Sequence, residues 1–222
     1  VTPTQLYGRL LPNARAEERP FRYGRGDMQI HLALSEPPRW DGDERLNRTA
    51  IVHLTPGLDG VSRSVNEADR GLLPEEATVV VGQPLTMDPS RAPEGRGLIW
   101  IQLQELPRRF DWTEEARERY ADRIVERLAR HVPNLSIIGR VVLSPADLER
   151  ANINLVEGDP YSGALSLDQN FLWRPLPGRP GHATEIDGLW HIGASTHPGP
   201  GLGGGSGTIV AKRLLRKGVL RR

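Results

Sequence analysis

The sequence predicts an α+β fold with an antiparallel or mixed sheet, and three observations support this prediction. Short apolar runs, alternating or β-branched and separated by proline and glycine turns, recur over the first two thirds of the chain. One long segment, residues 111–132, carries a single apolar stripe at helical spacing. The last segment, residues 187–217, reads as a short strand, a glycine-dense loop and a helix.

The strands are predicted from their side-chain pattern. Between Met28 and Leu34, apolar residues alternate with smaller or polar ones, which is typical of a half-buried strand, and Pro37 ends the run. Other runs are β-branched and compact, or alternate over their second half. The predicted strands cover residues 28–34, 50–54, 78–82, 97–104 and 135–143.

The segment 111–132 is predicted to be the longest helix. Asp111 is suited to cap it, Glu114 completes a capping box, and Pro133 ends it. Its charged residues lie opposite the apolar stripe and indicate a solvated face. A shorter helix is predicted to begin at Ser64, which is also suited to a cap.

Composition excludes several classes of function. The 222 residues carry a formal net charge of +1, which gives no electrostatic footprint for nucleic acid. The chain has no cysteine, which excludes disulfides, thiolate nucleophiles and cysteine-ligated metals. The six histidines show no metal-ligand spacing, so we expect no metal site. No long apolar run or signal peptide is visible, so a cytoplasmic setting is expected.

The glycine-dense C-terminal segment carries the candidate chemistry. A buried strand is predicted at 189–192, and a helix is predicted to begin near Ser206 as its N-cap. The exposed N–H groups and the dipole at the start of such a helix favour negative charge. The glycines of 199–205 would let the backbone approach a ligand closely.

Three interpretations of these glycines compete. A P-loop needs a lysine after the last glycine, and none follows Gly205. Gly199, Gly201 and Gly204 match the dinucleotide fingerprint, but no βαβ unit can be completed before Arg222. The third interpretation is a strand, loop and helix that close over a cofactor held mainly elsewhere.

The third interpretation agrees with a family resemblance. The stretch 193–199, Gly-Ala-Ser-Thr-His-Pro-Gly, resembles the C-terminal flavin signature of phytoene-desaturase-like FAD-dependent oxidoreductases. Upstream stretches agree with it, and the branch most resembled is that of the pyridine nucleotide-disulfide oxidoreductase domain-containing proteins. These stretches are residues 33–38, 100–104, 165–169, 174–175 and 188–189.

The resemblance implies a partial enzyme. Residues 1–150 would be part of a substrate-binding domain, and residues 151–222 the C-terminal part of a Rossmann-like FAD-binding domain whose N-terminal βαβ unit is absent from this chain. An N-terminal chain or fragment carrying GxGxxG would be the partner, and alone this chain should bind FAD poorly. The implied reaction is hydride transfer between an apolar organic substrate and flavin.

The resemblance also implies the cofactor contacts. The helix start would stabilise the reduced flavin, the strand exit would let the cofactor pass close to backbone, and the loop would lie along the flavin ring. The residues implied are Gly193, Ala194, Pro198, Gly199, Gly201, Leu202, Gly204, Gly205, Ser206 and Gly207.

Side chains outside this set carry open alternatives. His197 is the candidate acid-base or flavin-contacting group, or it only shapes the loop. Gln102 and Gln104 face a substrate cavity or a solvated sheet face. Arg174 pairs with phosphate or packs structurally. The alternative function for the whole chain is a non-catalytic module whose glycine loop binds an anion or docks to another subunit.

Overall fold

The computed structural model describes residues 1–11, 21–176, 179–201 and 203–216. The chain divides into two compact units, Arg25–Ala151 and Val1–Gly24 with Asn152–Arg222. The predicted α+β class is confirmed, with five helices and a five-stranded sheet in the described residues. Whether the two units are the expected substrate-binding and FAD-binding portions stays a prediction.

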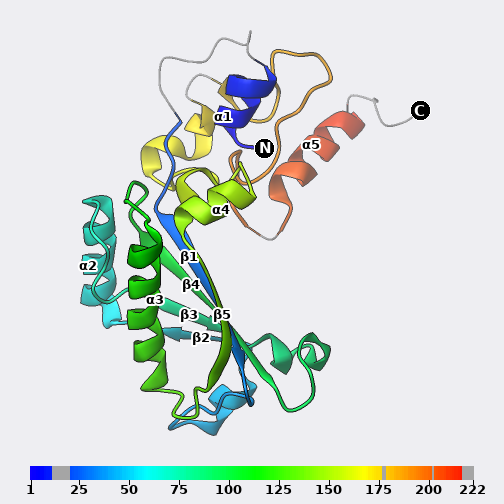
Figure 1. The fold of residues 1–222 in the computed structure, drawn as a ribbon. Helices are drawn as coiled ribbons and strands as arrows, with labels where there is room; N and C mark the ends of the chain where they lie inside the picture. The colour runs from blue at the N-terminus through cyan, green and yellow to red at the C-terminus, as the bar shows by residue number, and fades with distance from the viewer. Residues whose placement is uncertain (12–20, 177–178, 202, 217–222) are drawn as a thin grey trace. The chain divides into compact units, whose positions relative to one another are not determined.

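The unit Arg25–Ala151 is built on an antiparallel sheet with the order β2-β3-β4-β1-β5, which Figure 1 shows as one twisted layer. Each predicted strand forms within a few residues of its expected bounds. The strands are β1 Gly26–Leu34, β2 Ile51–Leu54, β3 Val79–Gly82, β4 Gly97–Leu106 and β5 Ile137–Leu143.

Two helices lie on the same side of this sheet, α2 Gly57–Asp69 and α3 Glu114–Ala129 (Figure 1). A shorter helix, α4 Pro145–Ala151, follows β5. The caps differ from prediction. Thr113, not Asp111, caps α3, because its side chain accepts from the Ala116 N–H at 3.2 Å. Ser64 lies buried inside α2, where its hydroxyl donates to the backbone.

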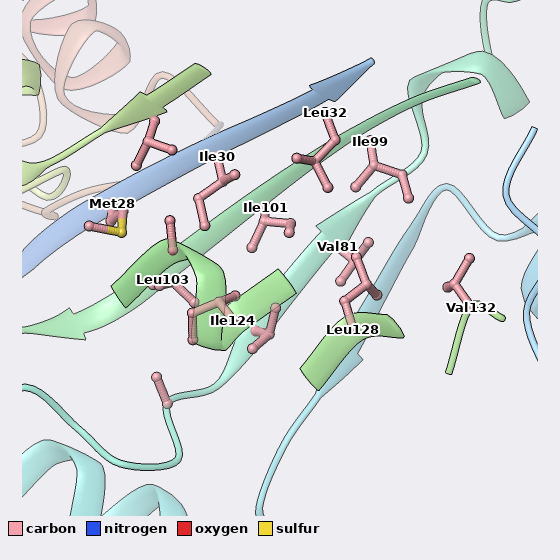
Figure 2. Close-up of a cluster of buried hydrophobic side chains, with 14 of the residues drawn as sticks. Met28, Ile30, Leu32, Val81, Ile99, Ile101, Leu103, Ile124, Leu128 and Val132 are labelled. Carbon is pink, nitrogen blue, oxygen red and sulfur yellow. The ribbon is translucent and has the colours of Figure 1, made fainter. Parts of the chain in front are cut away.

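The core of this unit lies between the sheet and α3. Alternate residues of β1 and β4 point into it, and the predicted stripe of α3 packs against them, as Figure 2 shows. The α3 residues Tyr120, Ile124 and Leu128 are buried there. The strands carry an apolar pattern of period two and α3 carries one of helical period. Because both patterns are visible in the sequence, these elements were predicted correctly.

The other unit is mostly irregular. It contains α1 Pro3–Gln5, short 3-10 turns, the two-residue strands β6 Pro175–Leu176 and β7 Arg179–Pro180, and α5 Gly205–Arg216. A small apolar cluster joins the two separate segments of this unit. Its buried members are Leu6, Tyr7, Phe21, Tyr23 and Leu176.

The strand predicted at residues 189–192 is wrong. Within the described residues the run forms a single bridge, between Trp190 and Ala183. Leu189 is 36% exposed and Ile192 is 45% exposed, while His191 between them is buried. Four apolar-looking residues make a strand only where a neighbouring strand supplies the ladder, and here one bridge is all that forms.

Candidate functional site

The predicted cofactor loop is largely open at its surface. Gly193, Pro198, Gly201 and Gly204 are exposed, whereas Ala194, Gly199, Gly205 and Gly207 are partly buried. A Cβ added at Gly193, Gly199, Gly201, Gly204 or Gly207 would meet no atom within 4 Å. The loop therefore has free space along its backbone, which is what a ligand seated on it requires.

Ser206 closes the base of this loop. It was expected to cap the helix, but α5 already begins at Gly205. The Ser206 hydroxyl instead accepts a 2.9 Å hydrogen bond from the Gly193 N–H, and Ser206 is buried. This bond ties the start of the loop to the start of α5, thirteen residues apart.

Gly205 has a different role from its neighbours. A Cβ at Gly205 would lie 2.8 Å from the Pro198 ring, so the glycine lets the loop pack against the first turn of α5. A substitution at Gly205 would therefore disturb the loop itself, whether or not a ligand binds. Leu202, also predicted to contact the cofactor, lies outside the described residues.

The first turn of α5 presents backbone donors. The earliest intrahelical bond runs from the Thr208 N–H to the Gly204 carbonyl at 3.0 Å. Among the described residues, the N–H groups of Gly205, Ser206 and Gly207 have no hydrogen-bond partner. This is the ordinary state of a helix N-terminus, and it favours negative charge nearby.

His197 is placed in the loop as predicted, and both of its expected roles stay open. Its carbonyl accepts from the His182 ring nitrogen Nε2 at 2.7 Å, which holds the backbone. Its own ring lies 6.5 Å from the Phe171 ring, centroid to centroid.

Of the two roles expected for Arg174, pairing with phosphate or structural packing, its contacts agree with structural packing. Its guanidinium is fully buried and bonds four backbone carbonyls rather than an anion. The acceptors are Ala194 O at 2.8 and 3.1 Å, Ala164 O at 3.2 Å, Tyr161 O at 3.2 Å and Ser162 O at 3.4 Å. Burial lowers the pKa of Arg174.

Asp159 complements Arg174 on the same turn of chain. Its buried carboxylate accepts from the backbone N–H groups of Gly24, Tyr161 and Gly163 at 2.7–2.8 Å. Asp159 thus accepts hydrogen bonds from N–H groups of the turn at 161–164, and Arg174 donates hydrogen bonds to carbonyls of the same turn. Through Ala194, Arg174 connects this turn to the predicted cofactor loop, a link that no sequence pattern indicates.

The predicted substrate residues lie on β4. Gln102 and Gln104 are partly buried, on alternate positions from the core residues Ile101 and Leu103. The Gln102 amide donates to Asp27 Oδ2 at 2.8 Å. The face opposite the core also carries Trp100, whose ring covers Gly82 so closely that a Cβ there would lie 1.9 Å from it.

Asp27 is a buried acidic residue of the kind found in functional sites, and the sequence analysis did not identify it. It is 1% exposed, and its second oxygen, Oδ1, has no hydrogen-bond partner among the described residues. Burial raises the pKa of Asp27 to about 7, and the nearby Glu105 carboxylate adds to the shift. Nothing in the pattern Gly26-Asp27-Met28 indicates burial, because a charged residue on that strand face would ordinarily be solvated.

Two kinds of feature are absent from the described residues. The part of the chain that the structure describes contains no cluster of three or more histidine or acidic side chains that would hold a metal ion. In the same residues, no helix has both the length and the apolar character needed to cross a membrane.

Comparison with known proteins places the chain in context. No protein-family model matches it. It is 30% identical over 202 residues to pyridine nucleotide-disulfide oxidoreductase domain-containing protein 2 of Rattus norvegicus, covering 85% of this chain and 35% of that protein. It is 32% identical over 161 residues to a lycopene-forming phytoene desaturase of a Paracoccus species, covering 68% of this chain and 31% of the desaturase.

Its homologues are pyridine nucleotide-disulfide oxidoreductase domain-containing proteins and phytoene desaturases. The family resemblance predicted from the sequence is thereby confirmed. A limonene dehydrogenase subunit of Castellaniella defragrans is a further relative, 27% identical over 199 residues, covering 84% of this chain and 36% of that protein. The chain spans about a third of the length of these relatives.

Proposed function

We propose that this chain is the C-terminal part, or a subunit, of an FAD-dependent oxidoreductase that moves a hydride between an apolar organic substrate and flavin. The observation that supports this most strongly is the homology, over 85% of the chain, to an oxidoreductase domain-containing protein. Desaturases and dehydrogenases among the relatives are consistent with it. Bound FAD would supply the electron chemistry, and the protein would supply position and electrostatics.

The residues present fit such a cofactor. The loop from Gly193 to Gly204 leaves open space where side chains would otherwise stand, and its glycines include three with left-handed backbone. An extended, partly negative molecule needs close backbone approach and N–H donors, and the α5 start offers both. The residues that would hold it are those implied by the resemblance, from Gly193 to Gly207.

Each neighbouring side chain then has a defined task. Ser206 fixes the distance between Gly193 and the helix start. Arg174 holds the Ala194 carbonyl inward and so fixes the backbone at the point where the loop begins. His197 is the histidine of the loop, and we propose it as the acid-base candidate because an imidazole can both accept and donate a proton.

The sheet face opposite the core is proposed to contact the substrate. Gln102 and Gln104 lie on it, and Trp100 adds a broad aromatic surface held flat by Gly82. An apolar molecule would gain mainly from burying surface against Trp100, while the glutamines orient its polar atoms.

A partner carrying the N-terminal, GxGxxG-containing part of the FAD-binding domain is proposed to complete the enzyme. One relative is itself named as a subunit of limonene dehydrogenase, which supports assembly from more than one chain. In the unit containing α5, large apolar side chains lie exposed in one short stretch, which suits a surface that packs against protein. They are Leu167, Phe171, Leu172 and Trp173.

The experiment is a flavin-binding measurement on the chain purified with its co-expressed partner. Yellow material with flavin absorbance, or saturable FAD binding by fluorescence, supports the proposal. Gly201→Val is the informative variant, because Gly201 has no left-handed backbone and its new side chain would enter open space. We expect at least roughly tenfold weaker FAD binding without loss of fold. Gly8→Val, also open and remote in sequence, is the matched control.

The alternative is a non-catalytic module that docks through the same loop. The exposed apolar side chains of Leu167, Phe171, Leu172 and Trp173 are equally consistent with docking, which needs no cofactor. A colourless complex that fails to bind FAD, with a partner that is nevertheless retained, would select this alternative. If Gly201→Val then released the partner, the loop itself would be the docking surface.

A further inference from the structure

The unit Arg25–Ala151 contains a surface depression of about 490 Å³ in which arginines predominate. Its lining holds four arginines and one carboxylate, a formal charge of +3 from four minus one. Two small residues and a proline complete it. The lining residues are Arg25, Ala68, Asp69, Arg70, Gly71, Pro107, Arg108 and Arg109.

Three segments distant in sequence bring these arginines together. Gly26 pairs with Leu106 across β1 and β4, so Arg25 and Arg108 flank the same end of the sheet. Arg70 is the C-cap of α2, and Gly71 follows it with left-handed backbone at φ 82° and turns the chain. Each arginine therefore lies just outside the end of a strand or helix, and the ends of β1, α2 and β4 bring the three segments together.

The one carboxylate does not neutralise the depression. Arg25 contacts Asp69 at 3.3 Å, and both side chains are substantially exposed, so this pair is weak. An arginine of this depression can contact a ligand while it keeps its hydrogen bond or ion pair within the protein. A guanidinium carries five N–H donors in a planar fork, and one contact leaves others available.

A second depression beside α2 provides an internal comparison. It measures about 190 Å³ and is lined by Arg63 with the glutamates Glu67, Glu75 and Glu76, a formal charge of −2 from one minus three. Two hollows on one unit thus carry opposite charge. A general excess of arginine in the sequence would not produce this separation.

We propose that the arginine-lined depression binds the diphosphate group of a small molecule. Its volume lies within the range of small-molecule sites, about 300–1,000 Å³. Guanidinium forks match the paired oxygens of phosphates, and several forks converging from three segments suit two linked phosphates better than one. None of its lining residues belongs to the proposed cofactor loop, so either proposal can fail alone.

The test is calorimetric titration of the full chain with inorganic pyrophosphate, orthophosphate and a glutamate-rich peptide. Saturable binding of pyrophosphate is expected, with orthophosphate at least roughly tenfold weaker and affinity falling as salt rises. Arg70→Gln and Arg108→Gln should each weaken pyrophosphate binding by roughly tenfold, as the loss of one charge-assisted contact implies. Arg63→Gln, in the glutamate-lined depression, is the matched control and should bind normally.

Other outcomes overturn the proposal. Absence of pyrophosphate binding by the folded wild-type chain would do so, as would equal weakening by Arg63→Gln. Orthophosphate binding as tightly as pyrophosphate would exclude a diphosphate site. Tighter binding of the acidic peptide than of pyrophosphate would identify the depression as a protein-docking surface instead. Circular dichroism of each variant confirms that binding is compared between folded proteins.

Discussion

Asp27 is a buried carboxyl group whose environment is expected to make the stability of the unit Arg25–Ala151 depend on pH. Gln102 satisfies one oxygen, but no cation pairs with the carboxylate within the described residues, and its pKa is raised to about 7. A raised pKa means that the folded state holds the proton more strongly than the unfolded state. The stability that depends on this proton is present below about pH 4 and is lost as pH rises through about 7.

We predict that Asp27→Asn stabilises the chain above pH 7. The amide keeps a hydrogen bond to Gln102 without burying a charge, so the gain at pH 8 should be on the order of 1–4 kcal/mol. Urea unfolding between pH 5 and pH 8 measures it. The wild type should lose stability across this range and the variant should not. Parallel pH profiles for the two proteins would contradict the assignment.

Arg174 shows how one residue can hold several segments through backbone alone. Its removal would leave the carbonyls of Ala194, Tyr161 and Ser162 without their buried donor, while the Ala164 carbonyl would keep a 3.3 Å hydrogen bond from the Gln169 amide. We predict that Arg174→Gln costs at least about 3 kcal/mol of unfolding free energy, since each orphaned buried group costs about 1–3 kcal/mol. Chemical denaturation measures this directly.

The control for Arg174 is another arginine of the same unit. Arg22 pairs with Asp168 at 2.5 Å, and these side chains are 51% and 62% exposed. Arg22→Gln should therefore cost less than about 1 kcal/mol. Similar losses for both variants would show that the buried carbonyl contacts of Arg174 contribute little.

At the scale of an element, β3 depends on a position with no side chain. The Trp100 ring of β4 occupies the place where a Gly82 Cβ would stand, 1.9 Å away. Gly82→Ala must displace the indole, and we predict a loss of about 1–3 kcal/mol together with a changed tryptophan emission spectrum. Gly139→Ala on β5 is the matched control, because its Cβ would meet Ala33 at an ordinary 3.7 Å. An unchanged spectrum for Gly82→Ala would refute the packing described here.

The elements that the sequence predicts well are those whose pattern is local. The five strands and α3 follow from alternation and from a helical stripe, and both are visible within one segment. The run at 189–192 has apolar residues too, but a strand needs a partner, and in the described residues it finds one bridge. The prediction that Ser206 is the N-cap of the helix is wrong for a related reason, since its hydroxyl accepts from the N–H of Gly193, thirteen residues away.

The sequence predicts where the glycine loop and the helix after it lie. It does not predict the contacts that support them. The glycine loop and α5 lie where the sequence indicates, because glycine density and helix-start chemistry are local signals. The partners of Arg174 are backbone carbonyls, which carry no sequence signature. Asp27 is likewise invisible to pattern, since its burial depends on the pairing of β1 with β4.

At the scale of the whole molecule, the two units differ in how they are built from the chain. The unit Arg25–Ala151 is continuous, and every member of its hydrophobic core lies between Met28 and Val142. The other unit joins two separate segments, and four of the five buried members of its cluster come from the first 24 residues. Folding of the second unit therefore requires both ends of the chain.

This difference predicts the behaviour of fragments. Residues 25–151 expressed alone should unfold cooperatively in urea, because the fragment keeps the complete sheet, α3 and the core between them. Residues 152–222 alone should show no cooperative transition, because the cluster around Leu176 loses Leu6, Tyr7, Phe21 and Tyr23. Adding a peptide of residues 1–24 should restore structure, because it supplies these side chains. It also supplies the Gly24 N–H, which donates a hydrogen bond to the Asp159 carboxylate. Far-UV circular dichroism with and without the peptide measures this, and a fragment 152–222 that folds without it would show that the apolar cluster is dispensable.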